Sequence, residues 1–205
     1  EAHQKNSTNR AGFDTRQQYP TLADGSPDPR EATFDRKNHH VGDSDYDNYG
    51  LFLNAEQGLD TKGKLYAFGG ISKRNSSSGA FYRRALDSRN VIEVYPDGFL
   101  PQISPEIIDY SLVTGYEFEL GKWQVDSSAG FGSNSFEYTL ENSINASLGP
   151  ISPTSFDAGT LSTSELNLNV DASSYYDFAN DSDLLVAMGV TWRQSGYQID
   201  AGQEE

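Results

Sequence analysis

The chain has 205 residues, 30 of them acidic and 15 basic, and its formal net charge at pH 7 is −15. This excess of negative charge argues against a nucleic-acid partner, because the phosphates of DNA or RNA would be repelled. The absence of cysteine excludes disulfides and thiolate metal sites, and no stretch approaches the ~20 apolar residues that a membrane-spanning helix needs.

Residues 1–48 are polar and show neither helical nor strand periodicity. They are predicted to form a long irregular surface loop or leader, followed by a β-rich part over residues 49–205. The chain starts at Glu1 without a Met or a signal peptide, which indicates a mature protein or a piece cut from a longer one.

Three aspartates at alternate positions, Asp43, Asp45 and Asp47, are similar to the start of an oxygen-rich calcium loop. The match ends early, because Asn48 replaces the glycine and Asn54 replaces the final glutamate of such a loop. These aspartates are a calcium candidate, and a solvated acidic turn is the alternative. No motif for a cofactor is present.

Alternation of apolar and polar residues predicts strands over residues 49–56 and 64–72. Residues 73–106 then form a long connection in which basic and aromatic side chains are interleaved. Such side chains could bind an anionic or aromatic ligand through charge-assisted hydrogen bonds and stacking, and neutralisation of the surrounding acids is the alternative. The candidate ligand-binding residues are Phe81, Tyr82, Arg83, Arg84 and Tyr95.

The clearest pattern lies in residues 107–139, where two alternating runs flank a Gly-Lys connection. This pattern predicts a long antiparallel hairpin with one apolar and one polar face. Each arm has about ten or eleven residues and would span roughly 25 Å when tilted by ~45°, the height of the apolar band of an outer-membrane barrel. Aromatic side chains beside the short turn are typical of the interfacial girdle of such a barrel.

Alternating runs over residues 161–171 and 184–202 bring the total to about six strands. Shorter connections near 57–63, 120–122 and 171–182 alternate with longer ones at 73–106 and 132–160. Outer-membrane barrels sort their connections in this way, whereas sandwiches do not. The sequence therefore predicts an all-β fold of antiparallel up-and-down strands: about six strands of a larger transmembrane β-barrel with long loops, over residues 49–205.

Three stretches, YPDGFLP at 95–101, NASLGPISPTSF at 145–156 and WRQSGYQI at 192–199, resemble the barrel of TonB-dependent outer-membrane receptors. The resemblance implies a segment of a 22-stranded barrel that imports siderophores, cobalamin or carbohydrates, without the plug domain and the energy-coupling box. The partners it implies are outer-membrane lipid, the remainder of the barrel and the plug, TonB in the intact receptor and a small nutrient ligand. The location it implies is the outer membrane of a Gram-negative bacterium.

Two other function classes stay open. One is an extracellular binding or structural β-protein that self-associates through open sheet edges. The other is an enzyme, for which Glu117 and Glu119, about 7 Å apart on one strand face, form the only carboxylate pair of note. Aligned acids in a barrel lumen explain that pair more simply, and no nucleophile or phosphate-loop motif is present, so an enzyme is not expected.

Overall fold

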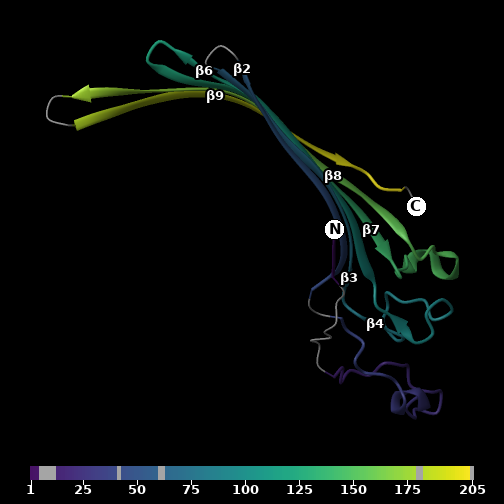
Figure 1. The fold of residues 1–205 in the computed structure, drawn as a ribbon. Helices are drawn as coiled ribbons and strands as arrows, with labels where there is room; N and C mark the ends of the chain where they lie inside the picture. Colours follow the sequence, from purple (N-terminus) through teal and green to yellow (C-terminus); the bar gives the residue numbers. More distant parts are fainter. Residues whose placement is uncertain (5–12, 41–42, 60–62, 179–181, 204–205) are drawn as a thin grey trace.

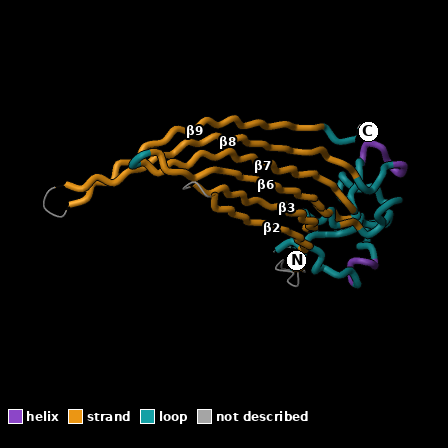
Figure 2. The backbone as a smooth tube through the Cα atoms, turned by 45° about the horizontal axis from the view of Figure 1, so that its top comes forward, coloured by secondary structure: helices purple, strands orange, loops and turns teal. Residues whose placement is uncertain are grey.

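The computed structural model describes residues 1–4, 13–40, 43–59, 63–178 and 182–203. Its main feature is one long, bent antiparallel sheet of seven strands in the order β1-β2-β3-β6-β7-β8-β9 (Figures 1 and 2). The strands are β1 (Ala2–Gln4), β2 (Asp45–Leu59), β3 (Gly63–Gly79), β6 (Gln102–Leu120), β7 (Trp123–Glu141), β8 (Phe156–Phe178) and β9 (Ser182–Asp200). The all-β, antiparallel, up-and-down prediction is therefore confirmed. Within the described residues the sheet stays open, with β9 at one edge and β1 and β2 at the other.

The six long strands have 15 to 23 residues each and are longer than the sequence predicts. The predicted strand over residues 64–72 continues to Gly79, and the first arm of the hairpin begins at Gln102. Of the added segments, residues 73–79 are polar on both faces, so no alternation marks them as a strand. Their backbone groups nevertheless pair with the neighbouring strands, and this pairing extends the sheet.

The connections alternate in length as predicted. Only Gly121 and Lys122 separate β6 from β7, and Gly121 has a positive φ of 64° that suits a tight turn. The connections over residues 80–101 and 142–155 gather at the opposite end of the sheet (Figure 2). They carry the short elements β4 (Arg83–Arg84), β5 (Gly98–Phe99) and η2 (Ala146–Ile151).

The N-terminal part is less irregular than predicted. β1 pairs with the start of β2, which begins at Asp45 rather than near residue 49. Residues 13–40 contain the short helix η1 (Pro29–Ala32) and pack against the 80–101 connection. We call these two segments together the loop cap. The buried hydrophobic residues of the described chain all belong to it: Tyr19, Tyr82, Ala85 and Phe99.

No helix or second sheet packs against either face of the large sheet in the described chain. No helix among the described residues has the length and apolarity to cross a membrane.

Candidate functional site

The two faces of the sheet differ in chemistry. Directly paired residues of antiparallel strands lie on the same face, so the register assigns every side chain to one of two faces. One face, here the apolar face, exposes large hydrophobic side chains from all six long strands. They are Tyr49, Leu51, Leu53, Leu59, Leu65, Ile71, Tyr110, Leu112, Leu120, Phe131, Leu168, Val170, Leu184, Met188, Val190 and Trp192, which we call the apolar band.

The apolar band ends abruptly on the side of the long connections. Beyond it the same face carries polar and charged side chains, and Lys73 Nζ forms an ion pair of 2.7 Å with Glu106 Oε2 there. On β2, β3, β7 and β9 the next residue of the same face is already polar or charged, whereas on β6 Ile108 and on β8 Leu166 come before the first polar residue. The polar residues beyond the band include Asp45, Asp47, Asn75, Glu106, Ser133, Ser135, Glu137, Ser162, Ser164, Gln194 and Gln198.

The band crosses the strands obliquely. On β2 the band ends at Tyr49. Following directly paired residues across the five strand steps from β2 to β9 leads from Tyr49 to Gln198. The boundary on β9 lies at Trp192, six residues away. At the short-turn end, the same tracing leads from Leu59 on β2 to Met188 on β9. The band on β9 continues four residues beyond Met188, to Leu184. The offset is therefore about one residue per strand.

Aromatic side chains lie at the short-turn edge of the band, as the sequence predicts. Tyr116 and Phe118 stack with ring centroids 5.1 Å apart. Trp123 and Tyr176 form an edge contact at 6.4 Å, and Lys122 Nζ lies 5.9 Å from the centroid of the Tyr176 ring. This combination of rings and an ammonium group is typical of a membrane interface.

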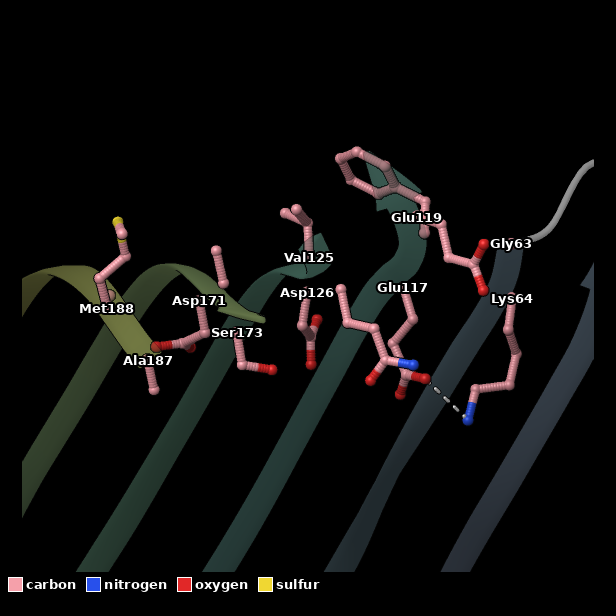
Figure 3. A pocket seen from close by; sticks show the side chains of 14 residues that line it. Gly63, Lys64, Glu117, Glu119, Val125, Asp126, Asp171, Ser173, Ala187 and Met188 are labelled. Atoms are coloured by element: carbon pink, nitrogen blue, oxygen red, sulfur yellow. Dashed lines mark ion pairs between the residues drawn. The ribbon is translucent and has the colours of Figure 1, made fainter. Parts of the chain in front are cut away.

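The opposite face, here the polar face, contains an open groove near the short turns (Figure 3). Lys64, Glu117, Asp126 and Asp171 are directly paired in one row across β3, β6, β7 and β8. Lys64 Nζ lies 3.2 Å from Glu117 Oε2, and the Tyr66 hydroxyl donates to Asp126 Oδ1 at 2.9 Å. Glu117 and Glu119 both line this groove, so the predicted carboxylate pair belongs to a larger group of acidic side chains.

The predicted ligand-binding residues lie together in the loop cap, but three of them make structural contacts. The Tyr82 hydroxyl donates to the Asp97 carbonyl oxygen at 2.8 Å, and burial raises the pKa of Tyr82 to about 12. Arg84 Nη1 donates to the Gln17 carbonyl oxygen at 2.8 Å. The Tyr95 ring stacks on Phe99 at 4.4 Å.

The other two predicted residues are more accessible. Phe81 is 53% exposed, and the Arg16 guanidinium lies 4.9 Å from its ring centroid. Arg83 is half-buried and pairs with Phe99 in the β4-β5 ribbon. A ligand role stays a prediction for all five residues, and Phe81 has the most accessible surface for it.

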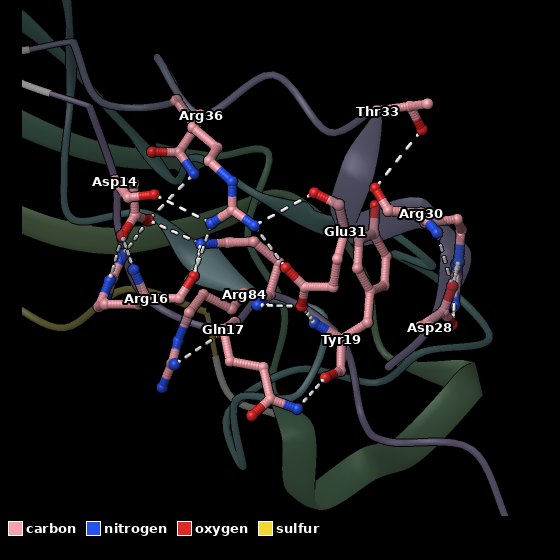
Figure 4. A network of polar contacts seen from close by, with 12 residues as sticks. Asp14, Arg16, Gln17, Tyr19, Asp28, Arg30, Glu31, Thr33, Arg36 and Arg84 are labelled. Atoms are coloured by element: carbon pink, nitrogen blue, oxygen red, sulfur yellow. Dashed lines mark hydrogen bonds and ion pairs between the residues drawn. The ribbon is translucent and has the colours of Figure 1, made fainter. Parts of the chain in front are cut away.

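A polar network, which the sequence analysis missed, joins the two segments of the loop cap (Figure 4). Glu31 Oε1 accepts hydrogen bonds from the backbone N–H groups of Gln18 and Tyr19 at 2.7 and 2.8 Å. Arg36 donates to the other oxygen of Glu31 and to the carbonyl oxygen of Arg16. The Tyr19 hydroxyl then donates to Asp97 in the 80–101 connection.

A repeated Asp-x-Arg motif could have revealed this network. In each copy the backbone N–H and the guanidinium of the arginine both donate to the aspartate two residues earlier, and these bonds lower the pKa of the aspartate. For Asp87 the pKa falls to about 2. The three copies are Asp14 with Arg16, Asp28 with Arg30, and Asp87 with Arg89.

The calcium candidate gains no support. Asp45 and Asp47 lie on β2, and the carboxylate of Asp47 contacts the His3 ring. Among the residues that the structure describes, no three His, Asp or Glu side chains are gathered so that they could hold a metal ion.

Comparison of the chain with models of protein families, with curated proteins and with solved structures found no significant match. The function is therefore inferred from the two faces of the sheet, from the loops and from the stretches that resemble a known family.

Proposed function

We propose that this chain forms part of the wall of a transmembrane β-barrel, in a TonB-dependent outer-membrane receptor for energy-coupled nutrient uptake. The observation that carries the proposal is the apolar band, which is exposed on all six long strands and bounded by polar residues. Soluble monomers rarely expose a continuous apolar patch larger than a few hundred Å². Contact with lipid chains removes this surface from water, at a gain of roughly 25 cal/mol per Å².

The slope of the band supports a tilted strand in a bilayer. An offset of four to six residues over five strand steps corresponds to roughly 13–20 Å along the strands and about 24 Å across them. The strands would then lean by roughly 30–40° from the membrane normal, close to the ~35–45° tilt of outer-membrane barrels.

The height of the band also suits a bilayer. On β6 it runs from Tyr110 to Leu120, a length of roughly 33 Å at the usual rise of a strand. With the tilt above, this length covers roughly 25–29 Å of membrane thickness, and the apolar band of an outer-membrane barrel is ~25 Å tall. The polar face would then line the lumen, with the long connections outside the cell.

One observation favours the alternative function as well. In the described chain β9 pairs with β8 alone, so its other edge leaves 19 residues of backbone without a neighbouring strand. Such an edge can pair with another strand. In the receptor that strand would come from the remainder of the barrel. In a self-associating β-protein it would come from another copy, and the apolar band would be buried between copies.

Tryptophan fluorescence in bilayers of brominated lipid tests the proposal. Trp123 and Trp192 are the only tryptophans, so replacing both by Phe gives a silent background for single tryptophans at chosen sites. Ala129→Trp places the probe on the apolar face and Ser128→Trp places it on the polar face. We expect bromine on the acyl chains to quench the probe at 129 and an aqueous quencher to reach the probe at 128. Equal quenching of the two probes by lipid, or no quenching of either, would contradict a lipid-facing band.

A further inference from the structure

Apolar side chains change faces along the sheet. Next to the short turns most exposed apolar side chains lie on the apolar face, although Tyr175 and Leu185 lie on the polar face there, and next to the long connections a row of apolar residues lies on the polar face. Ile107, Phe136, Leu161 and Ile199 are directly paired in one row across β6, β7, β8 and β9 on the polar face. The Tyr138 ring lies beside this row, 4.4 Å from that of Phe136. Under the proposed function this row lines the lumen outside the lipid layer, where lipid contact does not account for apolar residues.

A groove rich in hydrogen-bonding groups lies directly beside the apolar row. Its lining includes Asn134, Thr163, Glu165, Ser195 and Tyr197. The Tyr197 ring is 63% exposed, and Ser195 Oγ donates to Glu165 Oε2 at 3.3 Å. Amide, hydroxyl and carboxylate groups of β7, β8 and β9 therefore lie next to the aromatic and aliphatic surface of the apolar row.

The charge of the polar face restricts the ligand further. On the six long strands this face carries nine carboxylates against three basic side chains, so the field on this side repels anions. The carboxylates are Glu56, Asp109, Glu117, Glu119, Asp126, Glu165, Asp171, Asp177 and Asp183, and the basic residues are Lys64, Arg74 and Arg193.

We propose, building on the receptor function above, that this face binds an uncharged oligosaccharide. The apolar faces of sugar rings would stack on Phe136, Tyr138 and Tyr197, because such rings present C–H groups to an aromatic surface. The sugar hydroxyls would exchange hydrogen bonds with Asn134, Thr163 and Glu165, which together offer donors and acceptors. A polyanionic ferric complex lacks a basic partner surface on this face.

Binding of the full chain in lipid bilayers to an array of neutral and anionic glycans, together with a ferric tricatecholate complex, tests the ligand class. We expect retention of neutral glycans and none of the ferric complex. Tyr197→Ala should weaken retention by roughly three- to tenfold through the lost stacking surface. Gln198→Ala, the neighbouring substitution on the opposite face, should leave it unchanged.

Three results would overturn the ligand class: no neutral glycan retained, retention confined to anionic compounds, or equal retention by Tyr197→Ala and the unmodified chain. The lipid-quenching experiment separates this failure from failure of the receptor proposal. If the probe at position 129 contacts lipid and no glycan is retained, the proposal that the chain forms part of a barrel wall is kept and the proposal of an oligosaccharide ligand is rejected. If that probe does not contact lipid, the receptor proposal falls first.

Discussion

The Tyr19 hydroxyl donates a hydrogen bond of 2.9 Å to Asp97 Oδ1 and thereby joins two segments that lie 78 residues apart in the chain. Tyr19 is almost fully buried, and its ring makes an edge contact with Phe34 at 5.8 Å. Arg30 covers the ring at 4.0 Å and also contacts Asp97. The N-terminal segment is therefore attached to the long connection through a specific packed contact.

Tyr19→Phe tests this attachment. It removes one hydrogen bond and keeps the ring, so we expect a loss of roughly 0.5–1.5 kcal/mol in the stability of the loop cap. The Leu86 amide bonds to the Gln18 carbonyl oxygen across the same contact and should exchange its hydrogen three- to tenfold faster. Tyr95→Phe is the control, because the Tyr95 hydroxyl bonds to Ser143 in another connection. Equal effects of the two variants would refute a local attachment.

Glu31→Gln should destabilise the loop cap more than Tyr19→Phe does. Burial raises the pKa of this carboxylate, but the two backbone N–H groups and the guanidinium that donate to it outweigh burial and lower the pKa overall. The neutral amide cannot accept from all three donors through its two ends, so we expect a loss of roughly 1.5–3 kcal/mol. Protease cleavage within residues 13–40 measures this loss. Asp24→Asn, which alters a local turn at Ser26 only, should leave the cleavage rate unchanged.

The loop cap should loosen as the pH falls below 6.5. The His39 ring lies 4.9 Å from that of Phe81 and 6.0 Å from that of Tyr82. Burial and the nearby Arg16 lower its pKa, while Asp14 acts in the opposite direction. The unfolded cap therefore binds a proton at a higher pH than the folded cap, so stability is full above 6.5 and declines as the pH falls through the pKa of the folded form.

Hydrogen exchange at Leu86, corrected for the intrinsic pH dependence of exchange, measures this decline between pH 7.5 and 5. His39→Phe keeps an aromatic ring beside Phe81 and Tyr82 and removes the titrating group. In this variant the protection of the Leu86 amide should therefore stay constant over the same pH range. An unchanged decline in His39→Phe would assign the pH dependence to other groups.

A charge on the apolar face should impair insertion, and the same charge one residue away should not. Under the proposed function, Ala129→Arg would place a guanidinium among lipid chains, which costs roughly 2–4 kcal/mol at the middle of a bilayer. Ser128→Arg places it on the polar face, close to the Asp126 carboxylate in the acidic groove. Refolding into lipid vesicles at increasing urea concentration measures both free energies. A similar loss for the two variants would argue against lipid on one face alone.

Much of the fold follows from local patterns. The alternation from Tyr110 to Leu120 is enough to predict a strand with one oily face, because side chains of a strand point to opposite sides in turn. The segment over residues 102–106 lies within the long connection predicted over 73–106, yet it forms the start of β6. Its strand comes from pairing with β3 and β7, which no local pattern encodes.

The candidate site was predicted in part. The sequence predicts Tyr82 and Arg84 as ligand-binding residues because of their chemistry. In the structure both side chains form hydrogen bonds within the loop cap. The groove residues Thr163 and Tyr197 were not singled out, since they are 34 positions apart and become neighbours only through the register of β8 and β9. The Asp-x-Arg copies were visible in the sequence and were not recognised.

The sequence by itself determined that this protein is built from antiparallel strands with an oily and a polar side, joined by short and long connections in turn. These properties depend on neighbours in the chain and on the two-residue period of a strand. Only the tertiary structure decided how the oily sides line up into an oblique band, where apolar residues change faces and how residues 13–40 attach to the distant 80–101 connection. The reason is physical: register and packing join residues that are far apart in the chain, and their energies depend on which partner each strand and loop finds.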